Sequence, residues 1–139
     1  MTIYSMKIYV FGNPLVKNDS IPLMMIPELE KSFPDIQFII TDPNENFPPE
    51  NEKDLIILDT VKGITEARLF DLSDLKEISQ SPISPHDYDL LFHLLLLKKR
   101  KIIDRVKIIG VPLLYDRTKV VQVKKLIRKL ISQLLPGYP

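Results

Sequence analysis

The sequence contains no cysteine and no tryptophan, and only 4 of its 139 residues are glycine. Without cysteine the chain cannot form a disulfide, a thiolate metal site or an iron–sulfur cluster, and it has no cysteine nucleophile. Any metal that the chain contacts must therefore be held by oxygen and imidazole ligands. The 12 prolines against 4 glycines indicate stiff rather than loose turns.

An excess of charge of one sign is missing as well. The 19 lysines and arginines balance 18 aspartates and glutamates, which leaves a formal charge of +1. A protein that holds nucleic acid by electrostatics needs a large basic field, so we expect no nucleic-acid partner. A chain of this length buries one core, which predicts a single domain over residues 1–139 with residues 1–6 and 136–139 peripheral.

Long hydrophobic runs are also missing. The richest apolar run, residues 90–97, is interrupted by His93 and is far shorter than the ~20 residues of a transmembrane helix. The first seven residues lack the basic and then apolar layout of a signal peptide. We therefore expect no membrane association and a cytoplasmic location, and a monomer is the simpler expectation for the oligomeric state.

Several catalytic motifs are absent. The sequence has no His-Glu-x-x-His, no Gly-x-Ser-x-Gly and no glycine-rich phosphate loop, and Gly12-Asn13-Pro14 is not a dinucleotide fingerprint. These absences predict that the protein uses no organic cofactor.

What the sequence does contain is an alternation of strand and helix patterns. This alternation predicts an α/β fold, a three-layer sandwich in which a mostly parallel central sheet carries helices on both faces. The segment 55–58 is continuously apolar between Asp54 and Asp59, as expected of a buried central strand. The predicted strands are residues 7–11, 35–41, 55–58, 106–111 and a weaker edge strand at 67–71; the predicted helices are 21–32, kinked at Pro27, 85–99 and 119–135.

Two segments are predicted to be irregular. The loop 42–53 is rich in proline, asparagine and glutamate, and nothing in it is expected to be packed. The segment 73–84 is predicted as a loop with about one helical turn.

Ionisable residues follow three predicted strands, and another lies in the first turn of the predicted helix 85–99. Asp19, Asp42, Asp59 and His86 all fall near the carboxyl edge of such a sheet, where ligands bind in open α/β folds. A carboxylate directly after an apolar strand is costly unless it is ligated, hydrogen-bonded or exposed at a cleft. Each aspartate also has a structural alternative, because Asp19 fits a helix cap and Asp42 and Asp59 fit turns.

His86 lies in the predicted first turn of a helix. The helix dipole disfavours a positive side chain there, so the imidazole should stay neutral near pH 7, the form that binds metals. Two carboxylates and one imidazole suit nickel, zinc, iron or manganese, and spacing alone does not select among them. His93, seven residues later, is expected at a core or rim position.

Taken in chain order, the segments around these residues form a longer pattern. They are Lys-Ile-Tyr-Val-Phe-Gly-Asn-Pro-Leu from residue 7, Asn18-Asp19, Asp42, Leu-Ile-Ile-Leu-Asp ending at residue 59, Ile-Ser-Pro-His ending at residue 86, and Ile-Ile-Gly-Val-Pro from residue 108. This pattern resembles that of the nickel–iron hydrogenase maturation endopeptidases over residues 7–135. Its most specific part is Ile-Ser-Pro-His at the proper distance after Asp59.

The resemblance implies a function. Members of that family remove a C-terminal extension from the NiFe hydrogenase large-subunit precursor after nickel has been inserted. The resemblance places the catalytic and metal-contacting positions at Asp19, Asp59 and His86, and substrate binding at Asp42, Gly12 and Asn13. The nickel is carried by the substrate precursor, which is the implied partner.

The sequence departs from the family pattern in its glycines. The first glycine of Gly-x-Gly-Asn is Val10 here, and the Asp-Gly-Gly loop reads Asp42-Pro43-Asn44. These changes keep open the alternative of a non-catalytic, metal-dependent maturation chaperone or binding module on the same fold. A small-molecule enzyme of general α/β type is a third reading, although the polar, proline-rich loops do not suggest the enclosed apolar pocket it needs.

Overall fold

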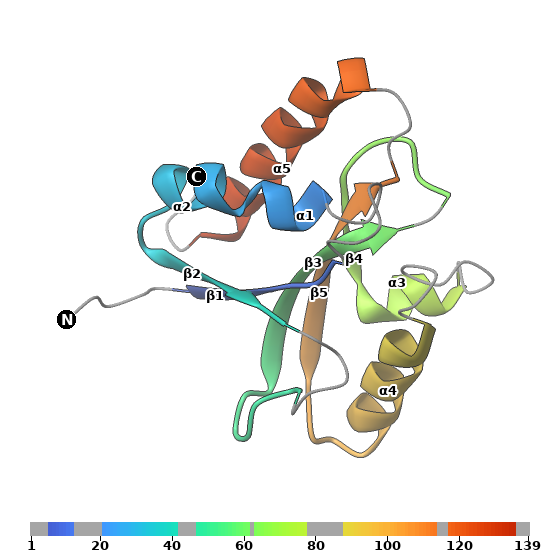
Figure 1. Ribbon diagram of the computed structural model, residues 1–139. Helices are drawn as coiled ribbons and strands as arrows, with labels where there is room; N and C mark the ends of the chain where they lie inside the picture. The colour runs from blue at the N-terminus through green and yellow to red at the C-terminus, as the bar shows by residue number, and fades with distance from the viewer. Residues whose placement is uncertain are drawn as a thin grey trace.

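A five-stranded sheet with helices on both of its faces forms the fold (Figure 1). The computed structural model describes residues 6–12, 21–41, 47–61, 63–77, 88–113 and 117–135. The strand order is β2-β1-β3-β5-β4, and all neighbours pair in parallel except β4, which is antiparallel to β5. The strands are β1 Met6–Val10, β2 Ile36–Ile40, β3 Asp54–Val61, β4 Arg68–Asp71 and β5 Arg105–Pro112.

The helices divide between the two faces of the sheet. Helices α1 (Ile21–Met24), α2 (Ile26–Ser32) and α5 (Val120–Leu134) lie on one face, and α3 (Leu72–Glu77) and α4 (Tyr88–Lys99) lie on the other (Figure 1). A short 3₁₀ helix, Arg117–Lys119, precedes α5. The predicted three-layer α/β arrangement with a mostly parallel sheet is therefore confirmed.

Each face of the sheet has its own apolar core, and periodicity explains which residues enter it. Alternate residues of β3 point to opposite faces, so Ile57 and Val61 join the α3/α4 core and Leu58 joins the α1/α2/α5 core. In α5, Val123, Ile127 and Ile131 recur every four residues and are buried against the sheet. None of the described helices is both long and apolar enough to cross a membrane.

Proline interrupts the first helical segment as the sequence predicts. A turn at Met25 separates α1 from α2, and Pro27 lies in the first turn of α2, where its missing N–H costs nothing. The edge strand predicted at residues 67–71 is confirmed as β4, at one end of the sheet.

Two predicted boundaries are corrected. Strand β3 continues to Val61 because its pairing with β5 continues to Val61 beside Pro112, so Asp59 lies inside the strand and not directly after it. The segment from residue 73 begins within helix α3, which covers Leu72–Glu77; residues 78–84 lie outside the described residues.

The connection between β2 and β3 is packed, which corrects the expectation that nothing in residues 42–53 would be. Phe47 is 7 % exposed and belongs to the α3/α4 core. Its ring meets Tyr9 and Phe11 of the first strand segment edge to face, with centroids 5.2 Å apart in both pairs. His93 on α4 contacts the same residue, with Nε2 3.2 Å from the Phe47 carbonyl oxygen. The Phe47 side chain therefore covers Tyr9 and Phe11 on the α3/α4 face of the sheet.

Glu52, close to the start of β3, joins the β2–β3 connection to two residues of β1. It accepts a hydrogen bond from the Tyr9 hydroxyl at Oε2, and its Oε1 lies 3.0 Å from Lys7 Nζ. Burial, followed by the hydrogen bond to Glu52 and its negative charge, raises the pKa of Tyr9 above its usual range. The folded chain therefore keeps the Tyr9 proton at a pH where the unfolded chain begins to lose it.

We predict that Phe47→Ala destabilises the fold by about 3–5 kcal/mol, because it removes a buried aromatic ring and leaves a cavity over Tyr9 and Phe11. Urea unfolding followed by circular dichroism measures this loss. Glu50→Ala, an exposed position in the same connection, is the matched control and should change the unfolding free energy by less than about 0.5 kcal/mol. Equal effects of the two substitutions would show that the connection is not part of the core.

The raised pKa of Tyr9 predicts a loss of stability in alkali. The unfolded tyrosine ionises near its reference pKa of 10.0, while the folded one stays neutral, so this stabilisation is present below about pH 10 and decreases above it. Relative to Tyr9→Phe, the parent should lose up to about 1.4 kcal/mol per pH unit above that point. Urea midpoints of both chains at a series of pH values test this, and parallel profiles would contradict it.

Candidate functional site

The order of the strands marks one place on the sheet as the natural ligand site. From β1 the chain first passes to β2 on one side and then returns to β3 on the other side of β1. In open α/β sheets, ligands bind at such a reversal, beyond the carboxyl ends of the two strands. The candidate site is therefore where β1 and β3 end.

Asp59 lies at this reversal. It is fully buried, near the carboxyl end of β3, on the same face as Ile57 and Val61. Its Oδ1 accepts a hydrogen bond from the Thr60 backbone N–H at 2.8 Å, which fixes the orientation of the carboxylate. The next two residues continue the strand, so the alternative that Asp59 caps a turn is wrong. A buried carboxylate loses the solvation that stabilises its charge, and such an arrangement is typical of functional sites.

Strand β1 stops just before the level of Asp59. Its last pairing with β3 is Val10 beside Leu58, and the Phe11 N–H donates to the Leu58 carbonyl oxygen at 2.9 Å. Gly12 follows and is half-buried. The backbone around Gly12 therefore borders the segment that carries Asp59.

Gly110 shapes the neighbouring position on β5. It pairs with Asp59 in the register of the sheet, and a Cβ atom placed on it would lie 2.8 Å from both Phe70 Cε2 and Val61 Cγ2. The Phe70 ring therefore occupies the space beside Asp59 that a side chain at 110 would take. Sequence analysis did not identify Gly110 as a site residue, although a glycine inside an apolar strand is a signal of close packing.

The remaining predicted site residues lie outside the described part of the chain. They are Asn13, Asp19, Asp42 and His86, and their proposed roles stay predictions. Described residues near two of them can be placed. Thr41, which precedes Asp42, donates its N–H to the Val10 carbonyl oxygen at 2.9 Å, and α4, whose first residue is Tyr88, packs on the face where Asp59 lies.

The described residues contain no cluster of three or more histidine, aspartate or glutamate side chains that could hold a metal ion. Asp59 is the one member of the predicted triad among them. His93 is exposed and contacts the Phe47 carbonyl oxygen, which excludes the core position allowed for it. Its ring contacts the β2–β3 connection.

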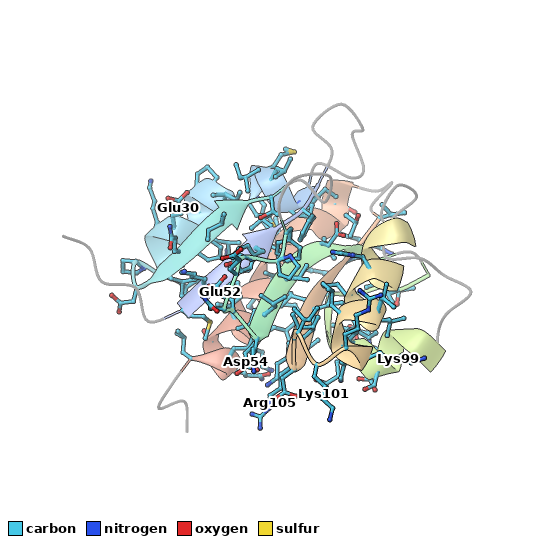
Figure 2. The ribbon with its side chains drawn as sticks, turned by 90° about the horizontal axis from the view of Figure 1, so that it is seen from below. Glu30, Glu52, Asp54, Lys99, Lys101 and Arg105 are labelled. Carbon is cyan, nitrogen blue, oxygen red and sulfur yellow. The ribbon has the colours of Figure 1, made fainter. Side chains whose placement is uncertain are left out.

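A cleft of about 580 Å³ lies at the opposite edge of the sheet, where the strands begin. Figure 2, seen from below the view of Figure 1, shows Glu52, Asp54 and Arg105 at this edge. The cleft is lined by charges of both signs, including Lys7 and Lys107, and by none of the predicted site residues. It is therefore separate from the site around Asp59.

Comparisons with known proteins find the similarity in the fold and not in the sequence. No family model matches the chain, and no curated protein matches it by sequence. Among solved structures, the NiFe hydrogenase maturation protease HybD from Thermococcus kodakarensis superposes with a TM-score of 0.65 at 17 % identity, covering 93 % of this chain and 97 % of that one.

Two further solved structures have a similar fold. The hydrogenase 3 maturation protease gives a TM-score of 0.60 at 18 % identity, covering 100 % of this chain and 94 % of that one. An uncharacterised protein from Wolinella succinogenes gives 0.59 at 16 % identity, covering 92 % and 94 %. The fold of this chain is thus similar, over nearly its whole length, to that of two hydrogenase maturation proteases, in agreement with the resemblance of its motifs.

Proposed function

We propose that this protein is an endopeptidase that removes a C-terminal extension from a nickel-loaded NiFe hydrogenase large-subunit precursor. The observation that carries the proposal is the buried carboxylate of Asp59 at the β1/β3 reversal. The same fold occurs in two hydrogenase maturation proteases. The Ile-Ser-Pro-His segment ending at His86 supplies independent support from the sequence.

In this proposal Asp19, Asp59 and His86 contact the nickel that the precursor carries. The chain has no cysteine, so its contacts to a metal come from oxygen and imidazole, and both ligand types suit nickel. The substrate's metal then serves as the recognition signal, because only a loaded precursor offers the three residues a common partner. Gly12, Asn13 and Asp42 hold the peptide beside it.

The reaction is hydrolysis of one peptide bond. Water adds to the carbonyl carbon, the C–N bond breaks, and the proton lost by the water passes to the departing amine nitrogen. A carboxylate of the site acts as general base toward the water, and the nickel polarises the carbonyl or the water. The hydrogen bond from the Thr60 N–H holds the Asp59 carboxylate in one orientation, as a base at a fixed position requires.

We predict that Asp59→Asn and His86→Ala slow cleavage of the loaded precursor by at least about 100-fold, because each removes a group that contacts the metal or moves a proton. Electrospray mass spectrometry of the precursor against time measures the rate. Asp54→Asn is the matched control, since it changes an exposed carboxylate at the other end of the same strand, and it should stay within about twofold of the parent. Cleavage by Asp59→Asn at the parent rate would overturn the mechanism.

Removing the nickel from the precursor should abolish its processing. We expect the loaded precursor to lose a short C-terminal peptide and the nickel-free precursor to keep its full mass under the same conditions. Cleavage of both forms equally would contradict recognition through the metal. Stable binding of the loaded form without loss of mass would instead favour the maturation chaperone over the protease.

A further inference from the structure

One edge of the sheet is formed by β2, which pairs with β1 on one side and has no neighbour on its other side among the described strands (Figure 1). Its sequence, Ile-Gln-Phe-Ile-Ile, contains β-branched and aromatic residues that favour extended structure. An edge of this kind presents unpaired backbone groups to any extended chain that reaches it.

The hydrogen bonds of β2 show which of its backbone groups point outward. The Thr41 N–H donates to Val10, so residues 37, 39 and 41 direct their backbone groups toward β1. The alternate residues, Ile36, Phe38 and Ile40, direct theirs away from the sheet. The Ile36 N–H is bonded to the Phe33 carbonyl oxygen at 3.1 Å. Phe38 and Ile40 therefore carry the outward N–H and C=O groups that an added strand would use.

The two edges of the sheet differ in how they are protected. Proteins usually guard an edge strand with charge, proline or a very short length. Strand β4 has four residues, with exposed Arg68 and Asp71 at its ends, and the Asp71 N–H is bonded to Asp74 Oδ2 at 3.0 Å. Strand β2 has neither a charge nor a proline over its five residues. Among the described residues, the β2 edge therefore lacks the protection that the β4 edge has.

The exposure of a β2 side chain also indicates that this edge binds a partner. Ile40, the last residue of β2, is 69 % exposed, which is unusual for an isoleucine in a strand. It lies at the carboxyl end of β2, the end of the sheet at which Asp59 also lies, and its side chain is on the α1/α2/α5 face with Ile36 and Phe38. An apolar residue of a bound strand would cover it.

We propose that the β2 edge binds an extended, mainly apolar segment of the large-subunit precursor by strand addition, and this inference rests on the proposed function. Main-chain hydrogen bonds to Phe38 and Ile40 would supply affinity with little dependence on sequence. An alternating apolar pattern in the segment would cover Ile40. The uncharged strand also means that no like charge repels the segment.

The dimensions of the sheet set the distance between this segment and the bond that is cut. Neighbouring strands lie about 4.8 Å apart, so a strand added outside β2 lies three spacings, about 14 Å, from β3 and Asp59. An extended chain rises about 3.3 Å per residue and crosses this distance in about four or five residues. The segment bound at the β2 edge therefore lies about that many residues from the cleaved bond.

Proline at position 40 tests the proposal directly. Ile40→Pro removes an outward N–H that β2 does not use for pairing with β1, from a side chain that is largely exposed, so the fold should tolerate it. We expect KM for the nickel-loaded precursor to rise about tenfold or more while kcat stays within about twofold. Ile40→Val, which keeps the N–H and the branched side chain, is the matched control and should behave as the parent does.

Hydrogen exchange supplies a second readout that needs no substitution. The amides of Phe38 and Ile40 should exchange rapidly in the free chain and at least about tenfold more slowly with precursor bound. Exchange of these two amides at the same rate in both states would overturn the proposal, even if Ile40→Pro fails to fold. The proposal is also overturned if the parent is a dimer in solution and Ile40→Pro is a monomer, because a second copy of the chain then occupies the β2 edge.

The failure of this proposal can be told apart from failure of the proposed function. If the parent binds the precursor without cutting it, the same three chains are compared by Kd, and a weaker Kd for Ile40→Pro alone still supports the β2 edge. If the parent cuts normally and Ile40→Pro cuts with the same KM, the β2 edge is wrong and the protease stands. A parent that neither binds nor cuts the precursor overturns both.

Discussion

Burial of a carboxylate within a central strand is the constraint around which this structure is organised. An ionised side chain without solvent costs several kcal/mol unless hydrogen bonds or a cation compensate it. Asp59 is nevertheless fully buried, with Oδ1 held by the Thr60 N–H. The surrounding sheet is arranged to tolerate this position, since β1 ends at Val10 and the Phe70 ring fills the place of a side chain at Gly110. The carboxylate is therefore held in one orientation at the end of the sheet where ligands bind in open α/β folds.

The two ends of the sheet have different roles in this arrangement. At the carboxyl end, β1 and β3 separate and leave Asp59 beyond their last pairing. At the amino end, Glu52 bonds to Tyr9 and Lys7. Phe47 packs on Tyr9 and on Phe11, which follows β1 and whose N–H is bonded to Leu58, the residue before Asp59. The β2–β3 connection is therefore held to β1 by polar contacts at the amino end and by aromatic contacts that reach the carboxyl end.

Much of the fold follows from patterns that the sequence displays directly. The apolar run 55–58 and the four-residue spacing of Val123, Ile127 and Ile131 are enough to locate β3 and α5, because burial on both faces or on one face leaves a clear period. The sequence pattern does not show where β3 ends. Asp59 is the kind of residue that usually ends a strand, and only the pairing of Val61 with Pro112 keeps it within β3.

Phe47 shows why long-range packing escapes sequence analysis. It stands among prolines, asparagines and glutamates, and its local composition is that of an exposed loop. What buries it is the aromatic surface of Tyr9 and Phe11, about forty residues away in the chain. Gly110 is similar, because its importance depends on Phe70 and Val61, which approach it from another strand and from the far end of β3. In both cases the partner, and not the residue itself, decides the role.

The surroundings of Val10 show the effect of one glycine of the family pattern that this chain lacks. Val10 stands where the family pattern has its first glycine, and a larger side chain there could close the substrate site. Val10 is fully buried in the α1/α2/α5 core, whereas Asp59 lies on the α3/α4 face with Ile57 and Val61. The added methyl groups therefore point to the opposite side of the sheet from the carboxylate. Gly12, the second glycine of the pattern, is kept where the chain borders Asp59. At this position the departure from the family pattern is accommodated by core packing and does not reach the face on which Asp59 lies.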